Sequence, residues 1–211
     1  FRRVLLVWTS TNMYKKIVPV PERYIETARE YGVRPDTRGS ELFPSSELQG
    51  SARLKMRAAG WDFNAETIGI CPGAKHFTKR WPASHLEALA QALLKRNYHL
   101  AVFGAEEDSS IAARLQRLNP KHVHDCSGRL TLLETAATMQ HCHGIISNDS
   151  GLMHMATAVG KPIVALFGST VREFGFFPYH QHSAVVEVEG LSCRPCTHIG
   201  RSSCPKGHFA C

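Results

Sequence analysis

Short apolar segments alternate with amphipathic helical segments between residues 67 and 167, and this alternation constrains the fold more than any other feature. It predicts strands and intervening helices in regular succession: strands at 67–71, 98–103, 122–124, 144–147 and 162–167, and helices at 83–96, 108–118, 131–141 and 151–159. Strands joined by helices of this length form a parallel sheet that is covered by helices on both faces. The sequence therefore predicts an α/β protein.

The pattern before residue 60 is less regular. It predicts a strand at residues 4–8, a helix at 21–33 with a proline in its first turn, and a turn-rich stretch at 35–44. Ser46-x-x-Gln49 has the spacing of a capping box and predicts a helix from Ser46 to about Ala59. The following Gly60 suits the end of that helix.

The composition favours an anionic ligand without naming one. Net charge is +7, with 12 histidines in addition, but the basic residues are scattered. This pattern fits either a solvated basic surface or affinity for phosphates and acidic membranes. A basic stripe with interleaved aromatic residues is lacking, which argues against nucleic-acid binding. No apolar run approaches the roughly 18 residues that span a bilayer. No signal peptide is recognisable and no initiator Met is present, so we expect a cytoplasmic protein, represented here by a fragment.

Polar or glycine-rich turns follow four of the predicted strands. They occupy residues 71–75, 103–107, 147–151 and 167–170. In parallel α/β sheets, ligands bind outside the carboxyl ends of the strands. None of the four turns is a Walker loop or a dinucleotide fingerprint, which argues against kinase and dehydrogenase functions. The repetition predicts a nucleotide-type ligand at this edge of the sheet.

The turn after residue 146 carries the strongest single signal. It reads Ser-Asn-Asp-Ser-Gly-Leu-Met-His and leads straight into a predicted helix, which Asp149 or Ser150 can cap. Free N–H groups and the helix dipole make such a start an anion site, with Gly151 at the first turn. Asp149 is either a cap or a group that binds sugar hydroxyls. His154 is either structural or a phosphate donor.

Two further turns hold residues with two interpretations each. Lys75, Thr78 and Lys79 are phosphate-capable donors that precede a helix, although the same loop also fits an exposed basic segment anchored by Trp81. Glu106 follows a strand and a glycine. A carboxylate there either accepts from ribose hydroxyls or simply complements a helix dipole.

The seven cysteines divide into two sets. Those at positions 71, 126 and 142 lie in apolar segments and are predicted to be buried thiols. The others form Cys193-x2-Cys196-x7-Cys204-x6-Cys211, of which only the first pair has regular metal spacing. We predict no metal site; these four cysteines, with nearby histidines, are the only candidate ligands, and disulfides or plain thiols are the alternative. An odd total without a secretory signal indicates a reducing compartment.

Together these blocks resemble glycosyltransferase family nine, the ADP-heptose:lipopolysaccharide heptosyltransferases. The resemblance covers about residues 15–211 and rests on Pro72-Gly73-Ala74 with Lys79–Pro82, Phe103–Glu106, Asn148–His154 and Cys193–Cys196. It implies a GT-B enzyme, in which two Rossmann-like domains face each other. Residues 1–60 would then be a connector and a remnant of the N-terminal acceptor domain. Residues 61–211 would be the C-terminal domain, which binds the nucleotide sugar and ends in the Cys-rich tail.

The resemblance also implies roles for individual residues. Lys79 matches a lysine that stabilises the departing ADP, and Asp149 matches an aspartate that holds heptose hydroxyls; these two are the catalytic candidates. Glu106 matches an acidic residue near the ribose, and Leu130 an apolar contact near adenine. The remaining donor-binding candidates are in the first loop and the helix start: Gly73, Ala74, Lys75, Thr78, Ser150, Gly151 and His154. Ala74 and Lys75 replace a hydroxyl-rich pair of the family.

The implied reaction is inverting transfer of heptose from ADP-heptose to the lipopolysaccharide inner core. It would need no cofactor, and the general base would lie in the other domain. The implied partners are the donor, the lipopolysaccharide acceptor and, peripherally, the inner membrane. Three alternatives remain open: a transferase for another nucleotide sugar, a non-catalytic nucleotide-binding module, and a metal-dependent nucleic-acid-binding protein.

Overall fold

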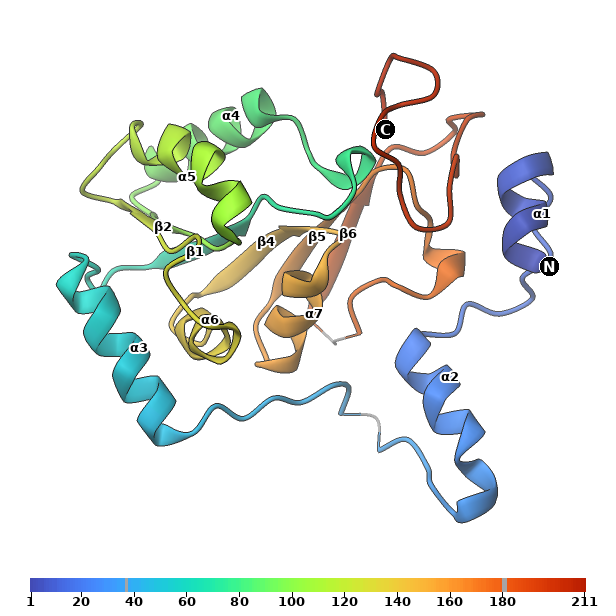
Figure 1. The fold of residues 1–211 in the computed structure, drawn as a ribbon, viewed down its shortest axis with the longest axis horizontal. Coiled ribbons are helices and arrows are strands. Elements are labelled where there is room, and N and C mark those ends of the chain that lie inside the picture. The colour runs from blue at the N-terminus through green and yellow to red at the C-terminus, as the bar shows by residue number, and fades with distance from the viewer. Residues whose placement is uncertain (37, 180–181) are drawn as a thin grey trace.

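The computed structural model describes residues 1–36, 38–179 and 182–211, and its centre is a parallel sheet of six strands (Figure 1). The strand order is β3-β2-β1-β4-β5-β6. The strands are β1 (Thr67–Cys71), β2 (His99–Val102), β3 (Val123–Asp125), β4 (Gly144–Asn148), β5 (Ile163–Phe167) and β6 (Ser183–Glu187). The α/β prediction is therefore confirmed.

Helices cover the two faces of the sheet with separate apolar cores. On one face, α4 (Ala83–Leu94) and α5 (Ser109–Gln116) pack on β1, β2 and β3. On the other face lie α3 (Ser46–Ala58), α6 (Leu132–Met139) and α7 (Gly151–Ala158). Because all strands are parallel, their carboxyl ends share one edge, and the loops that follow β1, β2, β4 and β5 meet there.

The strand predicted at residues 4–8 is wrong. These residues belong to α1 (Arg2–Thr9), in which Leu6 is buried while Val4 and Trp8 are 59% and 83% exposed. No described strand lies beside this segment to accept its backbone hydrogen bonds, and a helix satisfies them locally. In Figure 1, α1 and α2 (Val20–Thr27) lie to one side of the sheet, and an extended stretch leads to α3.

Several helix ends lie one to a few residues from their predicted positions, and two cases before residue 60 have a clear cause. The predicted capping box at Ser46 is wrong by one residue: Ser45 caps α3, and its Oγ accepts from Leu48 N at 3.3 Å. The predicted helix at 21–33 ends early, at Thr27, and a short 3-10 turn η1 (Arg29–Tyr31) follows.

Two further findings concern an edge strand of the sheet and the domain division of the chain. β6 was not predicted; it pairs with β5 at the edge of the sheet. The division of the chain at residue 60 stays a prediction, although α3 packs against α6 through buried Met56.

Candidate functional site

A cavity of about 710 Å³ lies at the carboxyl edge of the sheet, and we call it the edge cavity. Its lining comes from the loops after β1 and β2, the loop before α6, and the first turn of α7. The lining residues are Gly73, Ala74, Lys75, Arg80, Gly104, Ala105, Glu107, Asp108, Leu130, Leu132, Thr135, Ser150, Gly151, Leu152 and Met155. Three of the four predicted strand-end turns thus meet at one hollow, whereas the turn after β5 does not line it.

The first turn of α7 meets the edge cavity without a side-chain cap. Ser150 is the N-cap residue, but its side chain accepts no capping hydrogen bond, and its buried Oγ has no partner among the described residues. The prediction that Asp149 or Ser150 caps α7 through its side chain is therefore wrong. The Asp149 carboxylate is bound elsewhere, so the N–H groups of Gly151 and the next residues can bind an anion.

Lys79 and Asp149 form a buried ion pair beside this helix start. The Lys79 Nζ lies 2.7 Å from the Asp149 Oδ2, and the two side chains are 14% and 4% exposed. Thr170 Oγ1 donates to the same carboxylate oxygen at 2.7 Å. His154, one turn into α7, has a lowered pKa, first because it is buried and second because Lys79 is near, while Asp149 acts in the opposite direction.

The 3-10 turn η2 (Phe77–Lys79) positions Lys79, and backbone and hydroxyl contacts fix that turn. Thr78 N donates to Arg201 O at 3.2 Å, and Ser169 Oγ donates to Thr78 Oγ1 at 2.9 Å. A Cβ at Gly168 would come within 2.7 Å of Thr78 O, so only glycine allows this approach without displacement. Lys79 therefore depends on residues far from it in the sequence.

Asn148, the last residue of β4, connects the first loop to the segment after η2. Its Nδ2 donates to Pro72 O at 2.6 Å, and its Oδ1 accepts from Trp81 N at 3.2 Å. Arg80 Nε donates to Ala74 O at 2.7 Å. Arg80 also lines the edge cavity, a position that the basic loop suggested but that we did not predict as a site.

Glu106 lies beside the edge cavity without lining it. It begins the 3-10 turn η3 (Glu106–Asp108), and its carboxylate lies against Gly128, where a Cβ would overlap Oε2. It therefore flanks the loop that carries Leu130 and is not among the residues that line the edge cavity. Asp108, which sequence reasoning passed over, lines it instead, and its Oδ2 accepts from Ala105 N at 3.0 Å.

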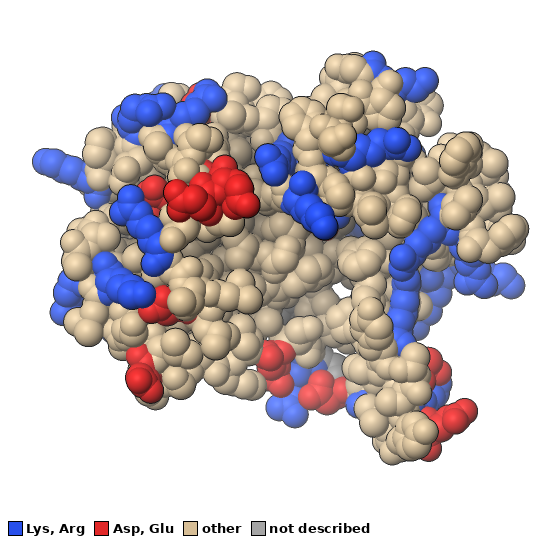
Figure 2. All heavy atoms as spheres, in the orientation of Figure 1, with Lys and Arg blue, Asp and Glu red and all other residues tan. Residues whose placement is uncertain are grey.

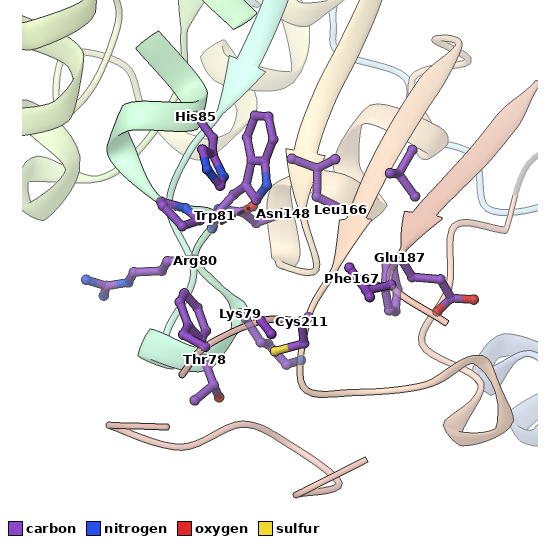
Figure 3. A pocket seen from close by; sticks show the side chains of 16 residues that line it. Thr78, Lys79, Arg80, Trp81, His85, Asn148, Leu166, Phe167, Glu187 and Cys211 are labelled. Carbon is purple, nitrogen blue, oxygen red and sulfur yellow. Dashed lines mark hydrogen bonds between the residues drawn. The ribbon is translucent and has the colours of Figure 1, made fainter. Parts of the chain in front are cut away.

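A second cavity, of about 200 Å³, lies on the other side of η2, and we call it the tail cavity (Figure 3). Thr78 and Lys79 line it together with Trp81, Leu166 and the chain end at Cys211. Of the predicted site residues, Gly73, Ala74, Lys75, Leu130, Ser150 and Gly151 line the edge cavity. Arg80, the residue after η2, lines both cavities.

The cysteines follow the predicted division. Cys71, Cys126 and Cys142 are buried free thiols, and burial raises the pKa of Cys126 to about 12. The tail cysteines at positions 193, 196, 204 and 211 are partly buried free thiols around one small cavity. Across the part of the chain that the structure describes, no group of three or more His, Cys, Asp or Glu side chains is arranged to hold a metal ion.

Comparison with known proteins identifies the family. The model of glycosyltransferase family 9 (heptosyltransferase) matches residues 6–206. The chain belongs to glycosyltransferase family 9. A lipopolysaccharide heptosyltransferase 2 of Salmonella typhimurium is 32% identical over 162 residues, which are 72% of this chain and 47% of that protein. A lipooligosaccharide heptosyltransferase 2 of Haemophilus influenzae is 35% identical over 51% of this chain and 32% of that protein.

Solved family 9 structures agree with the fold. The glycosyltransferase family 9 structure from Veillonella parvula has a TM-score of 0.72 and 27% identity, over 86% of this chain and 53% of that one. The ADP-heptose lps heptosyltransferase II of Escherichia coli has a TM-score of 0.62 and 27% identity, over 71% of this chain and 46% of that one. The chain thus spans about half the length of the family members it matches, and the resemblance seen in its motifs is confirmed.

Proposed function

We propose that this chain is the donor-binding half of a two-domain GT-B heptosyltransferase and that its ligand is ADP-heptose. One observation carries the proposal: the uncapped start of α7 lies at the edge cavity, and Asp149, two residues before that start, holds the ammonium of Lys79. The relatives named above as heptosyltransferases, one of them described by its ADP-heptose substrate, supply the identity of the ligand. The transfer proposed is to the lipopolysaccharide inner core.

Departure of ADP requires stabilisation of the negative charge that develops on the diphosphate. Lys79 Nζ and the N–H groups at the start of α7 are fixed donors for that charge. Ser150, whose buried Oγ has no partner among the described residues, lies next to these N–H groups. The step therefore needs no metal or other cofactor, because these groups supply the positive potential.

The rest of the edge cavity suits a nucleoside. Leu130, Leu132 and Met155 provide an apolar surface for a purine ring. The acidic η3 turn, with Glu107 on the cavity wall and Glu106 beside it, lies where carboxylates accept from ribose hydroxyls. Asp149 is then left for the hydroxyls of the transferred sugar, since it does not cap α7.

The acceptor side of the reaction belongs to the other half of the protein, including the general base. The net charge of +7 supports contact with phosphorylated lipid at the cytoplasmic face of the inner membrane. Across the described residues no helix is both long and apolar enough to cross a bilayer. In the view of Figure 2, Lys and Arg are scattered with acidic groups between them, without the continuous basic patch that nucleic-acid-binding proteins present.

Calorimetric titration of the 211-residue chain with ADP tests the proposal. We expect saturable binding and a rise in melting temperature with ADP concentration. Lys79→Ala should abolish binding at the same concentrations. Lys95→Ala is the matched control, because Lys95 is an exposed lysine at the far end of α4. Absence of binding at millimolar ADP, or equal loss in both variants, would contradict the proposal.

A further inference from the structure

The two residues after Gly168 contact both sides of the Lys79–Asp149 pair. Thr170 Oγ1 donates to Asp149 Oδ2 at 2.7 Å. Ser169 Oγ donates to the hydroxyl of Thr78, the residue before Lys79, at 2.9 Å. Ser169 and Thr170 are 1% and 3% exposed, so water competes little with either hydrogen bond. This short segment belongs to the strand-end turn that follows β5.

Arg194, from the Cys193–Cys196 block, donates hydrogen bonds to the backbone of the same segment. Its Nε donates to Gly168 O and its Nη2 to Thr170 O, both at 2.7 Å. The guanidinium is 8% exposed and also pairs with Glu187 at the end of β6. A planar guanidinium that donates to two carbonyls on either side of a dipeptide fixes the backbone of that dipeptide. The conformation of Thr170 is therefore set by the tail of the chain.

We propose that Thr170 is a positioning residue for Asp149, anchored by Arg194, and that it selects the sugar part of the donor. The proposal rests on the proposed function. Lys79 and Thr170 both bind Oδ2, and neither contact uses Oδ1. Two donors on one oxygen fix the plane of the carboxylate and hence the direction of the other oxygen. Oδ1 is then presented to sugar hydroxyls in one orientation.

The proposal predicts different effects on binding of the sugar and on binding of the diphosphate. Without the Thr170 hydroxyl, the Asp149 carboxylate keeps Lys79 as a partner but can turn about its last side-chain bond. Hydrogen bonds to sugar hydroxyls depend on that direction, whereas a lysine binds a diphosphate as a point charge. Loss of the hydroxyl should therefore weaken binding of ADP-heptose much more than binding of ADP.

The test compares the affinities of ADP and ADP-heptose for the 211-residue chain by calorimetry. Thr170→Val, which keeps the shape and removes the hydroxyl, should weaken ADP-heptose about tenfold and leave ADP within about twofold. Thr170→Ser should restore the wild-type ratio. Thr138→Val is the control, because Thr138 is an equally buried threonine on α6 whose hydroxyl donates to a backbone carbonyl.

A double-variant cycle isolates the contact from general stability. In an Asp149→Ala background, which has no side-chain acceptor, Thr170→Val should cause little further loss of ADP-heptose affinity, since the hydroxyl acts through the carboxylate. If Thr170→Val fails to fold, Arg194→Lys carries the same test: it keeps a cation but loses the planar fork, and it should lower the same affinity ratio.

The outcomes distinguish this proposal from the proposed function. A wild-type chain that binds neither ligand overturns both. A wild-type chain that binds both, with an unchanged affinity ratio in the folded Thr170 or Arg194 variant, overturns the positioning role alone. If Thr170→Val causes the same loss of ADP-heptose affinity with and without the Asp149 carboxylate, the positioning role is overturned as well.

Discussion

The buried pair of Lys79 and Asp149 allows a quantitative prediction about stability. Lys79→Met keeps the length of the side chain but leaves a carboxylate that is 4% exposed without its cation. Removing one partner of a buried pair typically costs about 3–5 kcal/mol. Because Lys79 is 14% exposed and Thr170 still donates to the carboxylate, we expect a smaller loss of stability, about 2–3 kcal/mol.

The loss should be reversible by a second substitution. In the double variant Lys79→Met/Asp149→Asn neither side chain is charged, and the new amide oxygen can still accept from Thr170, so stability should return to within about 1 kcal/mol of wild type. Thermal unfolding followed by circular dichroism measures both variants. For a chain of this length, the single variant should melt about 4–12 °C below wild type.

Binding of ADP should behave differently from stability. Both the single and the double variant lack the Lys79 ammonium, so both should bind ADP about tenfold or more weakly. Two results would refute the reasoning: a Lys79→Met chain as stable as wild type, or a double variant destabilised by the sum of the two single changes. Either result would mean that the pair is not the buried, coupled unit described here.

Three further substitutions have expected outcomes. Burial, with His99 adjacent, lowers the pKa of His124 to about 4. Between about pH 6.5 and 4 only the unfolded chain binds a proton at this histidine, so urea unfolding should show stability falling by up to about 3 kcal/mol as the pH drops through that window. The variant His124→Phe should show a smaller dependence of stability on pH. The ion pair with Lys55 and the hydrogen bonds of the helix cap lower the pKa of Glu134 to about 2. In urea unfolding at pH 7, Glu134→Gln should be about 1–2 kcal/mol less stable than wild type, and this difference in stability should shrink as the pH falls from about 4 to 2. A difference that stays constant over this pH range would contradict the prediction. Gly168→Ala should lower the free energy of unfolding by about 1–3 kcal/mol and weaken ADP binding in calorimetry, because the new Cβ displaces Thr78. A variant with wild-type stability and affinity would show that η2 tolerates this displacement.

The sheet and the meeting of its strand-end loops at one edge were predictable because their signals are local. Apolar runs separated by helical periods indicate parallel strands, and parallel strands bring their carboxyl ends together. The capping box of α6 is also a local signal, Thr131-x-x-Glu134: the Thr131 side chain accepts from Glu134 N, and the Glu134 side chain accepts from Thr131 N in return. The strand predicted at 4–8 failed because a short apolar run does not distinguish a strand from a helix without its tertiary neighbours.

The support of the site was not predictable because it is non-local. The Asp149 carboxylate is bound by Lys79, from the turn after β1, and by Thr170, from the turn after β5. The sequence left Asp149 open between a helix cap and a binder of sugar hydroxyls, because a sequence alone does not place these partners. Arg194 was noticed only as part of a motif, and its contacts with Gly168 and Thr170 depend on how the tail folds back.

A crystal structure of the 211-residue chain with ADP is the most direct test of the central claim. The account predicts that the diphosphate contacts Lys79 Nζ and the N–H groups at the start of α7, with adenine in the edge cavity near Leu130. ADP bound in the tail cavity, or a diphosphate that touches neither Lys79 nor α7, would contradict it.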